Sequence, residues 1–411
     1  MFLMKQAPVF SKAFKLKIAI MSDFHFGHND DALAQATEAL RKARELSDFV
    51  IAAGDLFDSR IPRQETIHDA MKLFKDHSRH AKTDSLKMTI IDGAERKVET
   101  VPVVAIYGTH ERRTKGLINA VQVLDSAGLV LNVHAKTLLV EKGGEKVAIQ
   151  GMGGVPEEQA AENLKLLEQK PVPGAFNIFV FHQSMKELIS VGENVMSAND
   201  LPPGFDLYVD GHIHWDQEIR SGGKRILLPG STVVTQMRAS EVKPKGFYVL
   251  DTSTGDASFV KINSRPFLFS EMVFQNASPS QVDEGVRGKL AEILIQAGGR
   301  APLVKLKLLG TLEKGIQPQN IDLGGVEKDF AERMELSIDK EFASEELKEK
   351  IELLRRLRDE KKSVRDMGLA VLDRKLAEAG VKINSEGLFE LLSEAKGAEK
   401  EEKIRRALEL V

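Results

Sequence analysis

Five short segments place carboxylate or imidazole side chains where we expect β-strands to end. The segments are Asp23-Phe24-His25, Gly54-Asp55-Leu56-Phe57-Asp58, Gly108-Thr109-His110-Glu111, Phe181-His182-Gln183 and Gly211-His212-Ile213-His214. Loops at the carboxyl ends of strands are where α/β sheets build their sites. We therefore expect the five segments to converge on one site.

The spacing and the residue types favour a metal site. In Asp23-x-His25 and His212-x-His214 the two side chains are two residues apart, so in extended backbone they project to the same face. The short carboxylate of Asp55 is suited to bridging two cations. Because the chain has no cysteine, a metal must be held by nitrogen and oxygen atoms, which favours manganese, iron, zinc or magnesium.

Glycines at positions 54, 108 and 211 begin three of the segments. We expect each of them to adopt a backbone conformation that other residues resist. Each segment alone is a weak signal, because a lone histidine at a strand end is more often structural and an aspartate before an apolar pair is commonly a turn residue. All five together have no packing rationale, so we infer a metal centre.

The surrounding sequence alternates apolar strands with amphipathic helices, which is typical of an α/β fold. In the first part we expect strands at 17–21, 49–53 and 103–107, and helices over 31–46, from Pro62 onward, and through 117–124. Between 138 and 263 we expect strands at 147–151, 178–181, 207–209, 226–228, 247–250 and 259–262. Several of these are continuous apolar runs, so we expect two packed sheets with outer helices. We interpret the polar segment from Arg79 to Thr100, with its turn at Asp92-Gly93, as a surface insertion.

The pattern changes at Arg265-Pro266 to strand, helix, strand, which marks a domain boundary. The stretch from about Ser344 is rich in Lys and Glu and has helical apolar spacing. We therefore divide the chain into residues 1–265, 266–340 and 341–411.

Composition narrows the class of protein. The 411 residues carry a net charge of −3, which argues against a protein that coats nucleic acid through a broad basic surface. No apolar run approaches the roughly 20 residues that span a bilayer, and the N-terminus lacks the features of a signal peptide. Together with the lack of cysteine, this predicts a cytoplasmic protein outside the membrane.

In their order, the five segments resemble the motifs of the calcineurin-like metallophosphoesterase superfamily, which are D-x-H, G-D-x-x-D/H, G-N-H-D/E, H and G-H-x-H. Within it, the chain is similar to the nuclease subunit that works with a coiled-coil ABC-type ATPase in double-strand-break repair. The features that carry this narrower resemblance are Gly54-Asp-Leu-Phe, Leu228-Pro-Gly-Ser-Thr232, Lys245-Gly-Phe-Tyr-Val249 and Arg265-Pro-Phe267. Specific motifs cover about residues 15 to 270, and domain order covers the remainder.

The resemblance implies two divalent ions, manganese being the expected metal. It assigns Asp23, His25, Asp55 and His214 to one ion, and Asp55, Thr109, His182 and His212 to the other. It also makes His110 the catalytic histidine, which stabilises the transition state or protonates the leaving oxygen. Thr109 stands where the family usually has Asn, and because a hydroxyl is a poorer ligand, we expect weaker binding of the second ion or binding through a water.

Three further residues have open roles. Asp58 occupies a position that is often His in the nuclease branch, and we expect it to support a ligand or to contact substrate. Arg112 and Arg113 could contact a nucleic-acid backbone, although a solvated helix start explains them equally well.

The resemblance implies a four-layer phosphoesterase β-sandwich flanked by helices (1–265), a small α/β capping domain for DNA (266–340) and a helical C-terminal region that binds the ATPase (341–411). A solvated helical bundle is the alternative for the last region. The implied activity is manganese-dependent exonucleolytic and endonucleolytic cleavage of DNA by a homodimer formed through helices in 62–75 and 115–125. Two alternatives stay open: a phosphodiesterase or phosphatase for small molecules, and a structural adaptor in which Thr109 has impaired the second metal site.

Overall fold

The computed structural model describes residues 16–114, 116–189, 195–343, 364–378 and 384–394. The chain divides into two compact units. The first comprises Met1–Phe269, Glu292–Lys305 and Phe330–Ser337, and the second comprises Ser270–Ala291, Leu306–Asp329 and Ile338–Val411. The three-part division at 265 and 340 stays a prediction.

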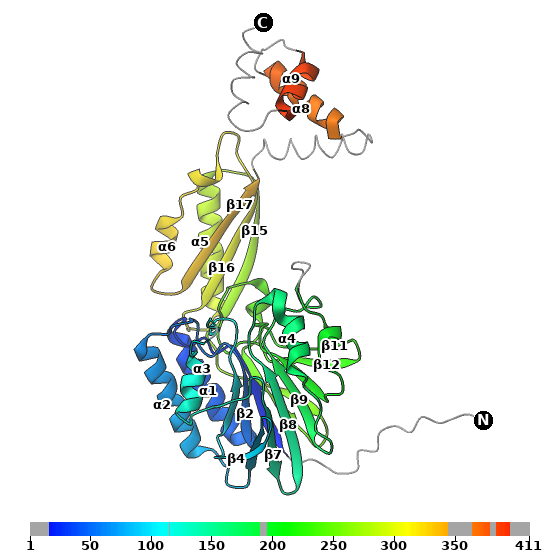
Figure 1. The fold of residues 1–411 in the computed structure, drawn as a ribbon. Helices are drawn as coiled ribbons and strands as arrows, with labels where there is room; N and C mark the ends of the chain where they lie inside the picture. The colour runs from blue at the N-terminus through cyan, green and yellow to red at the C-terminus, as the bar shows by residue number, and fades with distance from the viewer. Residues whose placement is uncertain (1–15, 115, 190–194, 344–363, 379–383, 395–411) are drawn as a thin grey trace, which may run out of the picture. The chain divides into compact units, whose positions relative to one another are not determined.

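A six-stranded sheet in the first unit has the order β14-β13-β1-β2-β5-β6 (Figure 1). Its strands are β1 (Lys17–Met21), β2 (Phe49–Ala53), β5 (Val103–Ile106), β6 (Leu131–Asn132), β13 (Gly246–Asp251) and β14 (Asp256–Lys261). Strands β1, β2, β5 and β6 run parallel, while β13 is antiparallel to β1 and to β14. The carboxyl ends of β1, β2 and β5 therefore lie at one edge, where the chain continues to Asp23, Asp55 and Thr109.

An eight-stranded sheet has the order β11-β12-β10-β9-β8-β7-β3-β4. Its strands are β3 (Lys87–Ile91), β4 (Glu95–Val98), β7 (Thr137–Lys142), β8 (Glu145–Met152), β9 (Phe176–Phe181), β10 (Leu207–Asp210), β11 (Gln217–Ser221) and β12 (Lys224–Leu228). Strands β8, β9, β10 and β12 are parallel. His182 follows β9, and His212 and His214 follow β10.

The core between the two sheets explains why their strands are apolar on both faces. Ile18 and Ile20 of β1 pack in one cluster with side chains of the eight-stranded sheet such as Val180. The alternate residues Ala19 and Met21 belong to a second cluster with the helices on the outer face. Burial on both faces gives the continuous apolar runs from which these strands were predicted.

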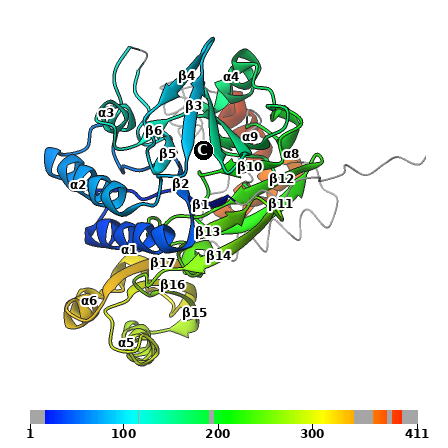
Figure 2. The same ribbon diagram turned by 90° about the horizontal axis from the view of Figure 1, so that it is seen from below.

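Helices cover the outer faces of both sheets, so the sandwich has four layers (Figure 2). Helices α1 (Asp30–Leu46), α2 (Gln64–His80) and α3 (Ala120–Ser126) cover the six-stranded sheet, and α4 (Ala160–Leu167) packs on the eight-stranded sheet. Short 3-10 helices are η1 (Glu157–Gln159), η2 (Ala198–Asp200), η3 (Ala239–Val242) and η4 (Pro318–Asn320). The predicted α/β fold is confirmed.

After the sandwich, β15 (Phe267–Ala277), β16 (Leu303–Leu312) and β17 (Glu335–Ala343) form a three-stranded sheet in that order. The remaining described helices are α5 (Pro279–Gln296), α6 (Gly324–Phe330), α8 (Val364–Glu378) and α9 (Ser385–Glu394). The predicted helix from Ser344 and the positions beyond 394 lie outside the described residues. No helix in the described ranges combines the length and the apolar character needed to cross a bilayer.

Two element predictions need correction. Helix α3 starts at Ala120 and excludes Leu117, because Asn119 caps it: its side chain accepts the Gln122 N–H, and the Gln122 side chain accepts the Asn119 N–H in return. The interpretation of 79–100 as a surface insertion is also wrong. The turn at Asp92-Gly93 does join β3 to β4, but β3 pairs with β7 and buries Met88 in the core between the sheets.

Candidate metal centre

The ligand-type side chains meet at the carboxyl ends of β1, β2, β9 and β10. Oδ1 of Asp23 lies 3.7 Å from His25 Nε2, 4.0 Å from His182 Nε2 and 3.8 Å from His214 Nε2. Oδ2 of Asp55 lies 3.1 Å from His182 Nε2. Three groups among the described residues have ligand atoms within 4.8 Å of one another. They are Asp23, His25 and His214; Asp23, Asp55 and His182; and His25, Asp58 and His110.

The loops that carry these ligands have a strained backbone. Asp23, His25 and Asp55 have φ angles of 52°, 47° and 46°, in the left-handed region that non-glycine residues rarely adopt. Such residues cost about 1–3 kcal/mol each and persist where the surroundings hold them. Here the Asp23 N–H donates to Gly54 O at 3.0 Å and the His25 N–H donates to Asp55 O at 3.1 Å. The loop after β1 is thereby fixed to the loop after β2.

The three motif glycines serve two different purposes. Gly54 has a φ of 99°, as predicted. Gly108 and Gly211 are not in the positive-φ region, so that prediction is wrong for them. Instead they allow close approach, because a Cβ at Gly108 would lie 2.1 Å from Asp55 Oδ1 and a Cβ at Gly211 would lie 1.9 Å from Ala53 O.

Each of the four ligand-type histidines has one ring nitrogen held from behind. The contacts are His25 Nδ1 to Asp58 Oδ1 at 2.9 Å, His182 Nδ1 to Ala53 O at 2.8 Å, His214 Nδ1 to Thr235 Oγ1 at 2.6 Å and His212 Nε2 to Ser184 Oγ at 3.1 Å. A partner on one nitrogen fixes the orientation of the ring and leaves the other nitrogen for a ligand bond. The Nε2 atoms of His25, His182 and His214 are those that face the carboxylates.

Unpaired buried atoms test whether this arrangement fits metal ions. Asp23 Oδ1, His25 Nε2 and His212 Nδ1 are buried and have no hydrogen-bond partner among the described residues. Leaving a buried polar atom unsatisfied costs about 1–3 kcal/mol. These atoms belong to the residues assigned as ligands, and carboxylate oxygens with imidazole nitrogens suit manganese, zinc, iron or magnesium. The residues therefore fit a pair of divalent ions.

Charge and burial work against each other at the site. Burial raises the pKa of the Asp23 carboxyl well above its usual range. For Asp55, burial opposes ionisation, but the charge and hydrogen bond of His182 lower its pKa below the ordinary value. For His182, burial disfavours the proton, but Asp55 raises its pKa to about 10. Binding of an ion at His182 Nε2 therefore requires the release of a proton.

Thr109 and His110 both contact Asp55. The Thr109 hydroxyl donates to Asp55 Oδ2 at 3.3 Å, and the His110 N–H donates to Asp55 Oδ1 at 2.8 Å. Behind them, Glu111 is fully buried and accepts the N–H groups of Phe57 and Gly108, both at 2.8 Å. Burial raises the pKa of Glu111 to about 8. Glu111 thus ties the second segment to the third.

Asp58 meets three imidazoles at the rim of the site. Its Oδ1 lies 2.9 Å from His25 Nδ1 and 3.7 Å from His110 Nδ1, and its Oδ2 lies 3.4 Å from His28 Nδ1. His110 Nδ1 is also 3.0 Å from the Asp58 carbonyl oxygen. Although partial burial raises it, the pKa of Asp58 is lowered overall by its bonds to His25 and His28. Asp58 therefore orients both a ligand and the predicted catalytic histidine.

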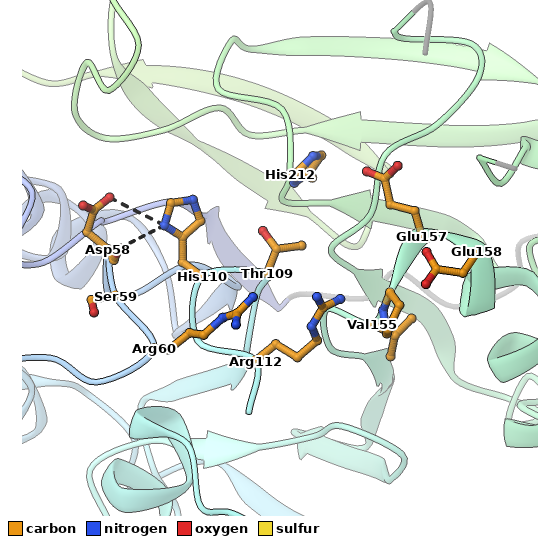
Figure 3. A pocket seen from close by; sticks show the side chains of 11 residues that line it. Asp58, Ser59, Arg60, Thr109, His110, Arg112, Val155, Glu157, Glu158 and His212 are labelled. Carbon is orange, nitrogen blue, oxygen red and sulfur yellow. Dashed lines mark hydrogen bonds and ion pairs between the residues drawn. The ribbon is translucent and has the colours of Figure 1, made fainter. Parts of the chain in front are cut away.

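A cavity of about 860 Å³ opens beside the metal centre (Figure 3). Its lining includes Asp58, Ser59, Arg60, Thr109, His110, Arg112, Glu157, Glu158 and His212. In Figure 3, Arg60 lies on the side of Asp58 and Ser59, whereas the end of the Arg112 side chain lies next to Val155. Arg113 is not among the lining residues, and its Nη1 lies 3.4 Å from the carbonyl oxygen of Arg60.

Comparison with known proteins identifies the domain that holds this site. Residues 16–216 match the family described as calcineurin-like phosphoesterase. This stretch is a calcineurin-like phosphoesterase domain. The predicted superfamily is confirmed, and the five segments before residue 216 lie inside the matched range.

The chain is similar to proteins that are named for double-strand-break repair. It is 26% identical over 318 residues to "DNA double-strand break repair protein Mre11" of Methanopyrus kandleri, which covers 70% of this chain and 66% of that protein. It is 25% identical over 305 residues to "Double-strand break repair protein MRE11" of Homo sapiens, covering 63% of this chain and 43% of that protein. The chain thus spans less than half the length of the human relative. A solved structure of an archaeal phosphodiesterase is 14% identical, with a match that covers 60% of this chain and 100% of that one at a TM-score of 0.28.

Sequence reasoning missed several residues of the phosphoesterase site. Arg60 lines the cavity. The sequence feature that could have indicated it is a positively charged residue two positions after Asp58. Ser184 and Thr235 hold His212 and His214. Ser184 follows His182 by two positions, but Thr235 lies 21 residues after His214, so only the fold brings it to that ring.

Proposed function

We propose that this chain is a nuclease that hydrolyses DNA phosphodiester bonds with two divalent ions, manganese by preference, during double-strand-break repair. The proposal includes exonucleolytic cleavage at duplex ends and endonucleolytic cleavage. The metal-dependent chemistry rests on one observation: Asp23 and Asp55 converge with His25, His182 and His214, and the His212 ring, whose buried Nδ1 is unpaired, lies beside that of His182. The names of the relatives support DNA as the substrate.

The ligand assignment follows the sequence prediction. Asp23, His25, Asp55 and His214 would hold one ion, and Asp55, Thr109, His182 and His212 would hold the other. When bound, such ions stabilise the charge that develops on phosphate and activate water as the nucleophile. The Thr109 hydroxyl touches the Asp55 carboxylate, which supports a place for Thr109 beside the second ion.

The cavity residues act on the substrate. Arg60 and Arg112 would bind backbone phosphates through charge-assisted hydrogen bonds. His110 lines the same cavity, and its Nδ1 is held by the carbonyl oxygen of Asp58. Its other nitrogen is left to stabilise the transition state or to protonate the leaving oxygen. Substrate contact by Asp58 or Arg113 stays a prediction.

Partners form a further part of the proposal. We propose a homodimer through 62–75 and 115–125. Exposed apolar side chains in the second range support it, since Leu117 is 53%, Ile118 66% and Val123 40% exposed, and Ile61, just before the first range, is 72% exposed. Lys115, within the second range, lies outside the described residues. We further propose that the C-terminal helices bind a coiled-coil ABC-type ATPase. A cytoplasmic location rests on the absence of cysteine.

A small-molecule phosphodiesterase is the second candidate. The cavity of about 860 Å³ lies within the range of roughly 300–1,000 Å³ that is usual for small ligands. The same motifs and metals would serve either substrate.

The decisive experiment measures cleavage of an end-labelled linear duplex and, in parallel, of bis-p-nitrophenyl phosphate. Wild type, His110→Ala and Thr109→Asn are each assayed with manganese and with EDTA. We expect wild type to cut the duplex only with manganese, His110→Ala to lose most activity, and Thr109→Asn to need less manganese. Cleavage of the small ester alone would favour the second candidate. An inert wild type that Thr109→Asn reactivates would favour the adaptor.

A further inference from the structure

His214 is backed by a chain of polar side chains that reaches away from the metal centre. Its Nδ1 lies 2.6 Å from Thr235 Oγ1, and this hydroxyl oxygen lies 3.5 Å from Glu241 Oε1. Glu241 is 2% exposed. Its carboxylate also accepts the N–H groups of Thr235 at 3.2 Å and Gln236 at 2.8 Å. The loop that presents Thr235 is therefore fixed by the same carboxylate.

Lys245 closes this arrangement from the other side. The side chain is 4% exposed, and its Nζ donates to Glu241 Oε1 at 3.2 Å, to Ser231 Oγ at 2.7 Å and to the carbonyl oxygen of His214 at 3.0 Å. All three donors of the ammonium group are used. One buried cation thus holds the backbone of His214 and neutralises the carboxylate that fixes Thr235.

The geometry of His214 decides which nitrogen carries the proton. Its Nε2 faces Asp23 Oδ1 at 3.8 Å, so ligation of an ion there needs a lone pair on Nε2. The proton then sits on Nδ1, where the Thr235 oxygen accepts it. The Thr235 hydroxyl hydrogen is then directed to Glu241 Oε1, which accepts it.

We propose that Thr235, Glu241 and Lys245 form a positioning relay that fixes the tautomer and orientation of His214 and thereby tightens one of the two metal sites. The inference rests on the proposed metal-dependent function. The relay also explains two residues of the sequence motifs that had no assigned role. Ser231 belongs to Leu228-Pro-Gly-Ser-Thr232, Lys245 begins Lys245-Gly-Phe-Tyr-Val249, and the two side chains bond each other in the relay. A fully satisfied buried polar network of this kind is rigid and is costly to interrupt.

The neighbouring ligand His212 has a weaker version of the same support. Its Nε2 lies 3.1 Å from Ser184 Oγ, and Ser184 donates to Glu157. Glu157, however, lies in the open cavity and has no buried lysine beside it among the described residues. Of the two arrangements, the relay behind His214 therefore restricts the orientation of its imidazole ring more strongly.

The test is a manganese titration of the full chain by isothermal calorimetry. The variants are Thr235→Val, Thr235→Ser and Lys245→Met, with Lys243→Met as the matched control. Lys243 is 53% exposed and bonds the carbonyl oxygen of Asp216, outside the relay. We expect Thr235→Val and Lys245→Met to weaken one of two sites about 10- to 100-fold, as is usual for groups that orient metal ligands. Thr235→Ser and Lys243→Met should bind like wild type, and unchanged binding by Thr235→Val would overturn the relay.

A second readout needs no metal. In EDTA-treated protein with 15N-labelled histidine, the His214 resonances, assigned by their loss in His214→Gln, report the tautomer. We expect the Nδ1–H form in wild type and in Thr235→Ser, and a shift toward the Nε2–H form in Thr235→Val, which is nearly isosteric and should fold. If wild type binds no manganese but this shift occurs, the proposed metal-dependent function fails, whereas the control of the His214 tautomer by Thr235 is retained. If Thr235→Val leaves the tautomer unchanged, the relay fails whatever the metal result.

Discussion

The floor of the metal centre and its rim are held in different ways. On the floor, the side chains of Asp23 and His182 are 0% exposed and that of Asp55 is 2% exposed. At the rim, His110 is 43% exposed and Asp58 is 30% exposed. Asp23 and Asp55 on the floor have left-handed backbone and belong to loops joined by backbone hydrogen bonds. The rim side chains instead line a cavity.

This difference separates two tasks of the site. The floor must hold several charges close together out of water, which only a rigid set of partners can do. The rim must accept a substrate, so its side chains keep contact with solvent. We therefore expect floor variants to lose metal and stability together, and rim variants to lose turnover or affinity alone.

The largest effect is expected from Asp55→Asn on the floor. Loss of the carboxylate that we propose is shared by the two ions should prevent binding of both and reduce cleavage to the level seen with EDTA. In EDTA the free energy of unfolding should also fall by about 3–5 kcal/mol, because a buried charge loses its partner. Manganese stoichiometry and urea denaturation measure the two effects. The matched control is Asp69→Asn, which breaks an Asp–His pair at the surface and should change neither.

A smaller effect is expected at the rim from His110→Ala. Loss of a general acid typically lowers kcat by about 10²- to 10⁴-fold, while manganese stoichiometry stays at the wild-type value. His28→Ala is the control, since His28 contacts the same Asp58 carboxylate but is not among the residues that line the cavity. If His110→Ala bound fewer manganese ions than wild type, the proposed division between metal-binding floor and substrate-binding rim would be wrong.

The arginines of the cavity should affect binding more than turnover. We expect Arg60→Ala and Arg112→Ala each to raise KM about tenfold, since a hydrogen bond to a charged group contributes about 1.5–3 kcal/mol, with kcat nearly unchanged. Steady-state kinetics on the labelled duplex measures this. Arg113→Ala sharpens the comparison, because an equal rise in KM would make Arg113 a substrate contact and an unchanged KM would limit it to supporting the Arg60 loop.

The smallest effect on activity is expected from a buried histidine away from the site. His77 on α2 is 2% exposed, and burial lowers its pKa to about 4. The unfolded chain protonates at the ordinary value near 6.5, so stability is fully present above pH 6.5 and is lost as the pH falls toward 4. At about 1.4 kcal/mol per pH unit, the loss approaches ~3 kcal/mol. His77→Met should flatten this dependence in urea denaturation at pH 4 to 7 without changing cleavage at pH 7.

The meeting of the floor segments could be predicted from the sequence for a physical reason. Strands such as β2 are apolar on both faces, so their ends are visible in the sequence, and Asp55 follows directly. The parallel order of β1, β2 and β5 then brings the loops together. Cavity residues such as Arg60 have no periodicity to mark them.

The remaining misses concern contacts between distant segments. The sequence predicts for Gly108 a backbone conformation that other residues resist. In the structure its missing side chain instead leaves space for the Asp55 carboxylate, and a contact between distant segments cannot be predicted from local sequence. The β3–β4 hairpin was read as an insertion because β4 is polar. The burial of β3 depends on its pairing with β7, which lies about 50 residues further along the chain.

That polar hairpin also bears on how the molecule behaves at high concentration. The eight-stranded sheet ends in β4 on one side and β11 on the other. Glu95, Arg96 and Lys97 on β4 are exposed, as are Gln217, Glu218 and Arg220 on β11. Charged residues on short outer strands discourage the addition of further strands from other molecules. The charged outer strands of the eight-stranded sheet should therefore reduce aggregation through its edges.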